Sequence, residues 1–549
     1  MVIQLPVYDT AIYRDFSTNT ETRETDMNVR RIINKCISIA IVTITLVSSS
    51  FFEVQAATPY TTTVTNFDSA GRQVTRFDTN GNAIDAHDGD LAYFNGKYYL
   101  YGTSYDCGYR LQVVGTPFCG FKAYSSTDLV HWTDQGFLYD ATTVARQASC
   151  APPRYGCYRP HVLYNNSTQK YVLWINGYDN ASGYHVFAAN TPTGPFIEQP
   201  EPQLAVMGTP GTFVNGDMDI FKDTDGTAYI AYTNIPSSHS IKIQRLNADY
   251  TSGVGAATTA VGSGVEAPSL FKRSGTYYLV FGPTCPYCGG TSTQYKTATT
   301  PLGPWGAAAQ INPTSCGGQP SFVSQLPGTS GDIYVYGSDL WNAGNPNQAL
   351  ANYFWNTLSF SGAAINAVPC SNTFTTTLGD GARGVIPIIA SADQSSGSSF
   401  FRTHCDIRSG WSRMQTFTPS RTGVLGKVAI TTFKNNANGA LKIDIVPVNG
   451  SAVPTGAPLY SGSIPASSIG WSPREIVISP NVQVTAGVSY GIVQRSPDTN
   501  NGGCYGILYS DYRPYQRGIA AYLPAANGTW TVESGRSLKF RTALGLTWR

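Results

Sequence analysis

A strand–turn–strand phrase recurs five times along this chain, and it constrains the fold more than any other feature. Each copy places a short apolar strand before a Gly/Asn/Asp turn and an aromatic-rich strand, which is typical of a β-hairpin. The copies read DLAYFNGKYYLYG, HVLYNNSTQKYVLWIN, DIFKDTDGTAYIAYT, SLFKRSGTYYLVFG and SFVSQLPGTSGDIYVYG. More strand and turn material follows each copy, so the repeat predicts a five-bladed β-propeller. A sandwich is the alternative, but it does not explain so regular a repeat.

The composition agrees with an all-β protein. Only 13% of the residues are charged, and few segments show a helical period, whereas turn residues recur between aromatic and β-branched runs. The net charge is +2 and there is no basic cluster. We therefore expect no nucleic-acid partner.

The chain is long enough for two or three domains, and its pattern changes near Ala390. A linker-like stretch, Ser391–Ser399, is followed by alternating strands such as KVAITTF, LKIDIVPV and VSYGIVQR. We predict the five-bladed propeller over residues 58–388. A separate β-sandwich (jelly-roll-like) domain is predicted over residues 389–549.

The start of the chain has the pattern of a targeting segment. Basic residues after Met27 precede the apolar run Ile37–Val47, and small residues follow at Ala56 and Ala57. This order is typical of a secretory signal peptide, so residues 1–57 are interpreted as leader and signal with a start at Met27. A membrane anchor is the alternative, but the apolar run is short of the roughly 20 residues that a span requires. We expect a secreted, extracellular protein with no membrane contact after cleavage.

Cysteine usage fits export. Of eleven cysteines, Cys36 lies in the leader, and the remaining even number favours disulfides in an exported chain. The sequence does not fix their connectivity. The pairs we consider plausible are 107–119, 150–157, 285–288, 316–370 and 405–504.

Acidic residues fall in register at the start of the repeats. When the five copies are aligned on their first strands, the residues just inside each start are Asp88, Arg159, Asp217, Ala267 and Gln319, with Glu266 before Ala267. The first strand of each propeller blade lines the central axis. The sequence therefore predicts that three acids, an arginine and a glutamine converge at one mouth of the channel.

Converging carboxylates repel each other, and burial raises their pKa, so such a ring indicates chemistry rather than stability. A pair of Asp/Glu side chains is what glycosidic bond hydrolysis needs: one acid protonates the leaving oxygen and one base activates water. The structural alternative is that each Asp is an ordinary turn residue before a strand. The shared register of Asp88, Asp217 and Glu266 favours the functional interpretation.

These residues resemble glycoside hydrolase family 43 over about residues 68–370. The resemblance implies a base at Asp88 in HDGDLAYFNGKYYLYG. It implies an acid at Glu266 in EAPSLFKRSGTYYLVFG, and at Asp217 in GDMDIFKDTDGTAYIAYT a residue that orients the acid and tunes its pKa. It also implies an inverting glycosidase acting on an oligo- or polysaccharide.

Within the family, FDTNGNAIDAHDG, YRPHVLYN and GGQPSFV look like the exo-β-1,3-galactanase branch. That branch usually lacks the first acid and uses a fifth-blade Gln, here Gln319, as base. It usually carries Glu where this chain has Tyr158. The chain departs at both positions, so the base is either Asp88 or Gln319, and the sugar is of the β-1,3-galactan, arabinan or xylan class.

The remaining expectations complete the site. Gln319, Arg159, Tyr158 and His87 are predicted to bind substrate. Because Gln319 occupies the neighbourhood where many family members hold a metal through His, we expect no metal and no cofactor. We also expect a monomer. The alternative function is a non-catalytic carbohydrate-binding exoprotein on a propeller scaffold.

Overall fold

The structure is a computed structural model of the whole chain. It describes residues 60–111, 113–152, 156–379, 392–396, 401–512, 515–524 and 528–545. The chain divides into two compact units, residues 1–58 and residues 59–549, and all described residues lie in the second. The predicted leader and signal peptide lies outside the described residues. So does the predicted boundary at residues 388 and 389.

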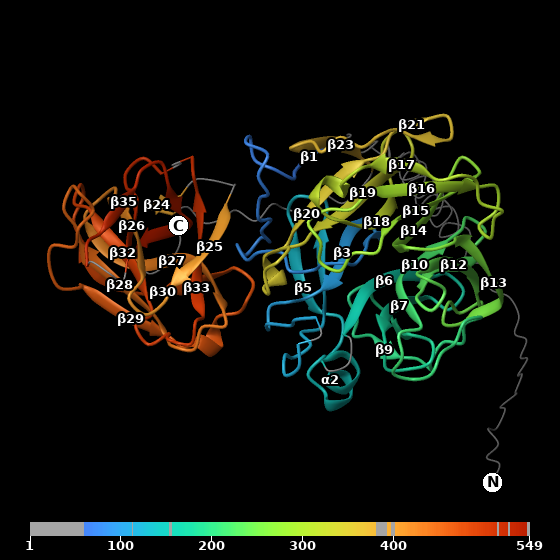
Figure 1. Cartoon of the computed structure of the whole chain (residues 1–549). Helices are drawn as coiled ribbons and strands as arrows, with labels where there is room; N and C mark the ends of the chain where they lie inside the picture. Colours follow the sequence, from blue (N-terminus) through green and yellow to red (C-terminus); the bar gives the residue numbers. More distant parts are fainter. Residues whose placement is uncertain are drawn as a thin grey trace, which may run out of the picture. The chain divides into compact units, whose positions relative to one another are not determined.

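Five antiparallel sheets follow one another along the first part of the described chain, and the hairpins of the sequence repeat form their first two strands (Figure 1). Four of these sheets have four strands, and the last has three. The strands are β2 (Leu91–Phe94), β3 (Lys97–Thr103), β4 (Phe121–Ser126), β5 (Thr133–Phe137), β6 (Cys157–Asn165), β7 (Lys170–Gly177), β8 (Tyr184–Ala189), β9 (Ile197–Glu198), β10 (Asn215–Lys222), β11 (Ala228–Asn234), β12 (Ser240–Leu246), β13 (Gly253–Val261), β14 (Val265–Arg273), β15 (Thr276–Pro283), β16 (Thr293–Ala298), β17 (Ala309–Asn312), β18 (Gln319–Leu326), β19 (Ile333–Leu340) and β20 (Asn352–Thr357).

The first strands of successive sheets lie side by side and close a ring. Strand β6 contacts β10, β10 contacts β14, β14 contacts β18, and β18 contacts β2, and the ring closes where β3, the partner of β2, contacts β6. Outside the ring, β1 (Tyr60–Thr65) pairs antiparallel with β23 (Thr373–Leu378), which joins the two ends of this region. The predicted all-β propeller architecture is confirmed.

Aromatic side chains fill the spaces between the sheets, which explains their abundance in the repeats. Trp174 and Tyr232 are fully buried in one cluster, and Tyr278 and Tyr336 in another. Ring pairs such as Phe271 with Tyr278, stacked 4.8 Å apart between centroids, add to the apolar area that they bury. This packing holds the inner strands in place around the axis.

The second part of the described chain forms two antiparallel sheets with an apolar core between them. This β-sandwich agrees with the predicted architecture. One sheet contains β24 (Gln394–Ser395), β37 (Phe540–Leu544), β27 (Gly423–Asn435), β33 (Cys504–Ser510), β25 (Arg402–Ile407), β30 (Arg474–Ile478), β31 (Val482–Val484) and β36 (Ser537–Leu538). The other contains β29 (Tyr460–Ile464), β28 (Leu441–Pro447), β32 (Tyr490–Arg495), β26 (Ser412–Phe417), β34 (Ala520–Leu523) and β35 (Thr531–Glu533).

Other regular elements in the described residues are short. They are the hairpin β21 (Phe360–Ser361) and β22 (Ala364–Ile365), the helix α2 (Val144–Cys150), and the 3-10 turns η1 (Ser315–Gly317), η2 (Gln348–Leu350) and η3 (Ala466–Ser468). No helix among the described residues is long and apolar enough to span a membrane.

Five disulfides are present, and all of them are pairs that we considered plausible from the sequence. They are Cys107–Cys119, Cys150–Cys157, Cys285–Cys288, Cys316–Cys370 and Cys405–Cys504. The disulfide framework predicted for an exported chain is therefore confirmed.

Candidate active site

Irregularities at the start of the inner strands aim the predicted residues at the axis. In β6, β10, β14 and β18 the pairing register shifts within the first few residues, which is the mark of a β-bulge. Asp88, Arg159 and Ala267 adopt positive φ angles of 54–55°. A bulge redirects a side chain that regular alternation would place elsewhere. The bulges and positive φ angles therefore lie at, or next to, the residues that the repeat alignment selected.

One cavity of about 130 Å³ gathers these residues. Asp88, Asp217 and Glu266 line it together with Arg159 and Gln319. The other lining residues are Leu111, Tyr158, Tyr178, Pro286, Tyr287 and Trp341. Six of the seven side chains predicted for the site therefore share one cavity, although they come from four different sheets and from the segment that precedes β2.

Asp217 and Arg159 form an ion pair at the side of this cavity. The Arg159 guanidinium donates from Nη2 to Oδ2 of Asp217 over 2.7 Å. Arg159 is 3% exposed, so its charge acts in a largely desolvated space. It is the cation that offsets the surrounding carboxylates.

Glu266 has the properties of a general acid. Its Oε1 accepts hydrogen bonds from the Cys285 backbone N–H (2.6 Å) and from Nε2 of Gln319 (2.8 Å). Burial raises the pKa of this carboxyl to about 7, and the negative charge of Asp217 acts in the same direction. Glu266 is therefore largely protonated in weakly acidic solution, where an ordinary glutamic acid is ionised.

Asp88 is nearly fully buried, at 4% exposure. Its Oδ1 accepts a hydrogen bond from the Thr103 hydroxyl (2.7 Å), and its backbone N–H donates to Oδ2 of Asp339 (3.1 Å). Burial raises the pKa of Asp88 well above its usual range, while the charge of Arg159 favours the ionised form. Sequence reasoning missed Asp339, because it lies at the far end of the second strand, β19, rather than at the start of a repeat.

Gln319 lies on the same side of the cavity as the acid. Its amide nitrogen donates to Glu266, and its Oε1 accepts from the indole N–H of Trp341 over 2.9 Å. These two contacts fix the orientation of the amide. They place Gln319 directly beside the acid, where it holds the Glu266 carboxyl.

His87 lies behind the cavity rather than in it, which corrects its predicted contact with substrate. Its side chain is fully buried and its ring stacks on Tyr353, with 5.0 Å between centroids. Its Nε2 lies 3.5 Å from Oδ1 of Asp85, and its Nδ1 lies 3.9 Å from Oδ1 of Asp339. The backbone turns between the two neighbours, where Asp88 has a φ of 55°, so the side chains of His87 and Asp88 are directed differently.

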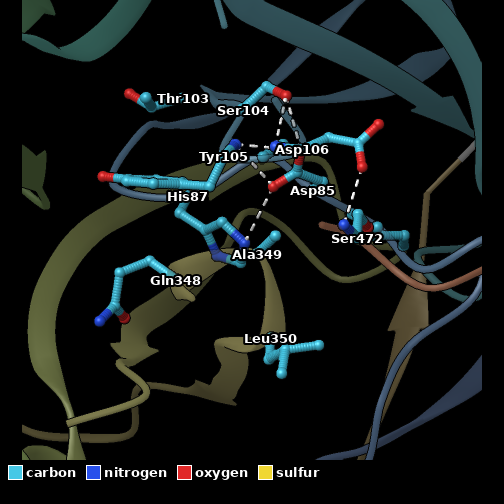
Figure 2. A network of polar contacts seen from close by, with 12 residues as sticks. Asp85, His87, Thr103, Ser104, Tyr105, Asp106, Gln348, Ala349, Leu350 and Ser472 are labelled. Carbon is cyan, nitrogen blue, oxygen red and sulfur yellow. Dashed lines mark hydrogen bonds and ion pairs between the residues drawn. The ribbon is translucent and has the colours of Figure 1, made fainter. Parts of the chain in front are cut away.

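Asp85 is a further buried carboxylate that sequence reasoning missed. Figure 2 shows it at the centre of a polar network: it accepts from the Ser104 hydroxyl (2.6 Å) and from the backbone N–H groups of Tyr105 and Asp106. Although burial alone would raise its pKa, the neighbouring His87 side chain, the charge of Lys122 and the hydrogen bond from Ser104 hold it below its usual range. Asp85 therefore anchors the turn that follows β3.

Among the described residues there is no group of three or more His, Cys, Asp or Glu side chains arranged to hold a metal ion. The expected absence of a metal and of a cofactor stays a prediction.

Comparison with known proteins identifies the family that this region resembles. Residues 82–324 match the model of "Glycosyl hydrolases family 43". The matched segment contains Asp88, Asp217, Glu266 and Gln319, so the resemblance stated from the motifs is confirmed over this segment.

Two curated relatives are similar over part of their length. An arabinoxylan arabinofuranohydrolase of Paenibacillus polymyxa is 26% identical in an alignment of 282 residues that covers 44% of this chain and 42% of that protein. A β-D-galactofuranosidase of Aspergillus niger is 26% identical in an alignment of 230 residues that covers 40% of this chain and 62% of that protein. The match thus spans less than two thirds of either relative.

Solved structures of similar fold include two exo-β-1,3-galactanases. The enzyme from Phanerochaete chrysosporium, crystallised with β-1,3-galactotriose, is 21% identical, with a TM-score of 0.47 over 81% of this chain and 100% of that chain. The enzyme from Clostridium thermocellum is 20% identical, with a TM-score of 0.49 over 88% of this chain and 100% of that chain.

Proposed function

We propose that the protein is a glycosidase that hydrolyses its substrate with inversion of the anomeric centre. The observation that carries this proposal is the cavity that brings together Asp88 from the segment before β2, Asp217 from β10 and Glu266 from β14, with the pKa of Glu266 raised to about 7. A carboxylic acid that keeps its proton near neutral pH, close to a second carboxyl, is the pairing that this reaction requires. The family 43 match over the same residues supports it.

In the proposed reaction Glu266 donates its proton to the glycosidic oxygen as the bond to the anomeric carbon breaks. Asp88 takes a proton from a water molecule that attacks the anomeric carbon from the opposite face. The products are a free alcohol and a sugar of inverted configuration, and both carboxyls return to their starting state by exchange with solvent. The raised pKa of Asp88 makes it a stronger base once it is ionised.

Asp217 acts on Glu266 rather than on the substrate in this proposal. Its negative charge helps to keep the proton on the acid, and its ion pair with Arg159 holds it in place. The substrate is proposed to be a plant-type polysaccharide side chain of the β-1,3-galactan, arabinan or xylan class. The aromatic lining of the cavity, with Tyr158, Tyr178 and Trp341, offers flat faces for sugar rings.

A screen with nitrophenyl arabinofuranoside, xyloside and galactoside, together with β-1,3-galactan, tests the activity. We expect hydrolysis of at least one substrate, and proton NMR of the earliest product is expected to show the inverted anomer. The matched control is Glu266→Gln prepared in parallel, which excludes a contaminating hydrolase. Sugar binding without any turnover would favour the carbohydrate-binding alternative, and a retained anomer would reject the mechanism.

Export to an oxidising compartment and a monomeric state are also proposed. The five disulfides support export. Thiol titration of the denatured, secreted protein is expected to find almost no free thiol, and N-terminal sequencing is expected to start after Ala56 or Ala57. Sedimentation at micromolar concentration is expected to give the mass of a single chain.

A further inference from the structure

We propose that a loop of the sandwich, Ile469–Arg474, is a positioning element of the candidate active site. It clamps the propeller loop Tyr105–Tyr109, and two tyrosines of that loop hold the cavity residues Tyr158 and Tyr287. This inference rests on the proposed function, because it is measured as turnover of a glycoside. The cavity-lining residues given above all come from the propeller, so the sandwich acts on the site through the propeller loop.

The first contact of the clamp is made by Trp471. This side chain is 8% exposed and belongs to the aromatic cluster of Tyr105, Tyr109 and other propeller residues. A Cβ on Gly108 would lie 2.5 Å from the indole nitrogen of Trp471, so only glycine leaves room for the ring there. The Trp471 backbone N–H also donates to the Asp106 carbonyl over 2.8 Å.

The second contact is made by the Asp106 side chain (Figure 2). The Ser472 backbone N–H donates to its Oδ1 over 2.7 Å, and the Arg474 guanidinium forms an ion pair with its Oδ2. A Cβ on Gly470 would lie 1.9 Å from Oδ1 of Asp106, so glycine is required at this position too. Each loop thus carries a glycine where the other loop inserts a side chain, which is the complementarity of a fitted interface.

The clamped loop is tied to the catalytic strands from its other side. The Asp106 backbone N–H donates to Oδ2 of Asp85, and Asp85 stands three residues before Asp88. Asp106 is therefore held between a carboxylate of the propeller and a loop of the sandwich. Movement at the sandwich loop can therefore reach the start of the first repeat through Asp106.

Two tyrosine pairs connect the clamped loop to the cavity. The hydroxyl of Tyr109 donates to the hydroxyl of Tyr158 over 2.7 Å. The hydroxyls of Tyr105 and Tyr287 lie 3.0 Å apart, and Tyr287 packs edge-on against Trp341 with 4.7 Å between centroids. Since Tyr158 and Tyr287 line the cavity, a shift of Tyr105 or Tyr109 displaces the surface that a sugar ring contacts.

The test uses the full-length protein with Trp471→Ala, Trp471→Phe and, as a matched control, Trp411→Ala. Trp411 stacks on Tyr522 within the sandwich, so its loss changes the same domain without touching the clamp. We expect Trp471→Ala to lower kcat/KM by roughly tenfold to 100-fold, mainly through KM, because misplacement of a binding surface by about 1 Å has an effect of this size. Trp471→Phe should keep most of the wild-type kcat/KM, because its ring still packs in the cluster. Trp411→Ala is expected to have the kcat/KM of the wild type.

Asp106→Asn is the second variant, in case Trp471→Ala does not fold. It keeps the side-chain shape and removes the charge that meets Arg474, and it is expected to raise KM by several fold. The double variant Trp471→Ala with Tyr109→Phe tests the route, because two changes on one path combine less than additively. Folded fractions are compared by circular dichroism, and rates are expressed per folded molecule.

The outcomes separate this inference from the proposed function. A wild type that hydrolyses none of the substrates rejects the proposed function. A wild type that is active, with folded Trp471→Ala and Asp106→Asn variants of unchanged KM and kcat, overturns the clamp alone. Fully additive effects of Trp471→Ala and Tyr109→Phe would also overturn the route through Tyr109.

Discussion

The buried carboxyls at the propeller axis and the buried Asp406 of the sandwich have pKa values shifted in opposite directions. At the propeller axis, burial raises the pKa of Asp88, Glu266 and Asp339. The positive charge of Arg159 opposes this shift but does not cancel it. In the sandwich, Asp406 is also buried, but it accepts two hydrogen bonds from Nε of Arg413 at 3.0 and 3.1 Å. Although burial alone would raise its pKa, hydrogen bonds from His404 and Arg413 hold it below its usual range.

This difference shows what each region does with a buried charge. The paired carboxylate of the sandwich is satisfied by its neighbours and supports the fold at neutral pH. At the propeller axis, burial outweighs the charge of Arg159, so ionisation of Asp88, Glu266 and Asp339 costs folding free energy. Groups that cost stability in this way mark a site of chemistry. The predictions below test the contrast between the two regions.

The largest expected effect is the loss of the acid. Glu266→Gln removes the proton that the leaving group needs, so hydrolysis of substrates with poor leaving groups should fall by about 100- to 10,000-fold. An activated aryl glycoside needs less protonation and should retain more of its rate. Steady-state kinetics on both substrate types checks this, and an equal loss on the two would contradict the acid role of Glu266.

The base is tested by comparing Asp88→Ala with Gln319→Ala. Water attack is needed for every substrate, so Asp88→Ala should slow good and poor leaving groups alike, again by about 100-fold or more. Added azide, which needs no base, should restore part of the rate. Since Gln319 hydrogen-bonds the acid, its loss should act mainly on poor leaving groups. Near-normal turnover by Asp88→Ala, with Gln319→Ala inactive, would instead make Gln319 the base.

In the sandwich the corresponding experiment changes stability instead of rate. Arg413→Met leaves Asp406 and Glu533 without the guanidinium that binds both, and breaking such a buried pair costs about 3 kcal/mol or more. The cost should be largest at pH 7. It should shrink as the pH falls through the lowered pKa of Asp406, because the protonated carboxyl no longer needs its partner. Chemical denaturation at pH 7 and pH 3 measures it, and kcat of the folded variant should be unchanged.

For Glu266, the dependence of folding stability on pH should have the opposite sign. Its pKa is about 7 in the folded protein and about 4.5 in the unfolded chain. The free energy of unfolding therefore falls by at most about 3 kcal/mol as the pH rises between these two values. The loss is absent below pH 4.5 and complete above pH 7. Glu266→Gln should therefore be more stable than the wild type at pH 8 and equal to it at pH 4. Thermal unfolding at the two pH values checks this. Equal stability of the variant and the wild type at pH 8 would argue against a raised pKa of Glu266.

The sequence predicted the inner ring because the repeat fixes the register. One alignment of five hairpins placed Asp88, Asp217, Glu266, Arg159 and Gln319 at equivalent positions, and all five line one cavity. The same alignment did not reveal the bulges. His87, which the alignment did not select, is predicted from the sequence to contact substrate, and the turn of the chain at Asp88 that precludes this is a backbone feature without a residue signature.

Residues outside the first strands were not found from the sequence, for a physical reason. Asp339 and Trp341 lie at and just beyond the end of β19, and Asp85 lies before the first repeat, so none shares the register that singled out the ring. Trp471 lies more than 300 residues from Gly108, and only the folded chain brings the two together. A pattern within one repeat cannot report a contact between distant loops.

The smallest effect is expected from Asp217→Asn, and it appears as a shift in pH dependence. The negative charge of Asp217 is the second cause, after burial, of the raised pKa of Glu266. Its removal also leaves the Arg159 charge unpaired in the cavity, and that charge favours ionised Glu266. Both changes lower the pKa of the acid, so the alkaline limb of kcat/KM should move to lower pH by about one unit. Asp406→Asn in the sandwich is the matched control and should leave the profile unchanged. A profile of Asp217→Asn that falls in height without moving would mean that Asp217 orients Glu266 but does not set its proton affinity.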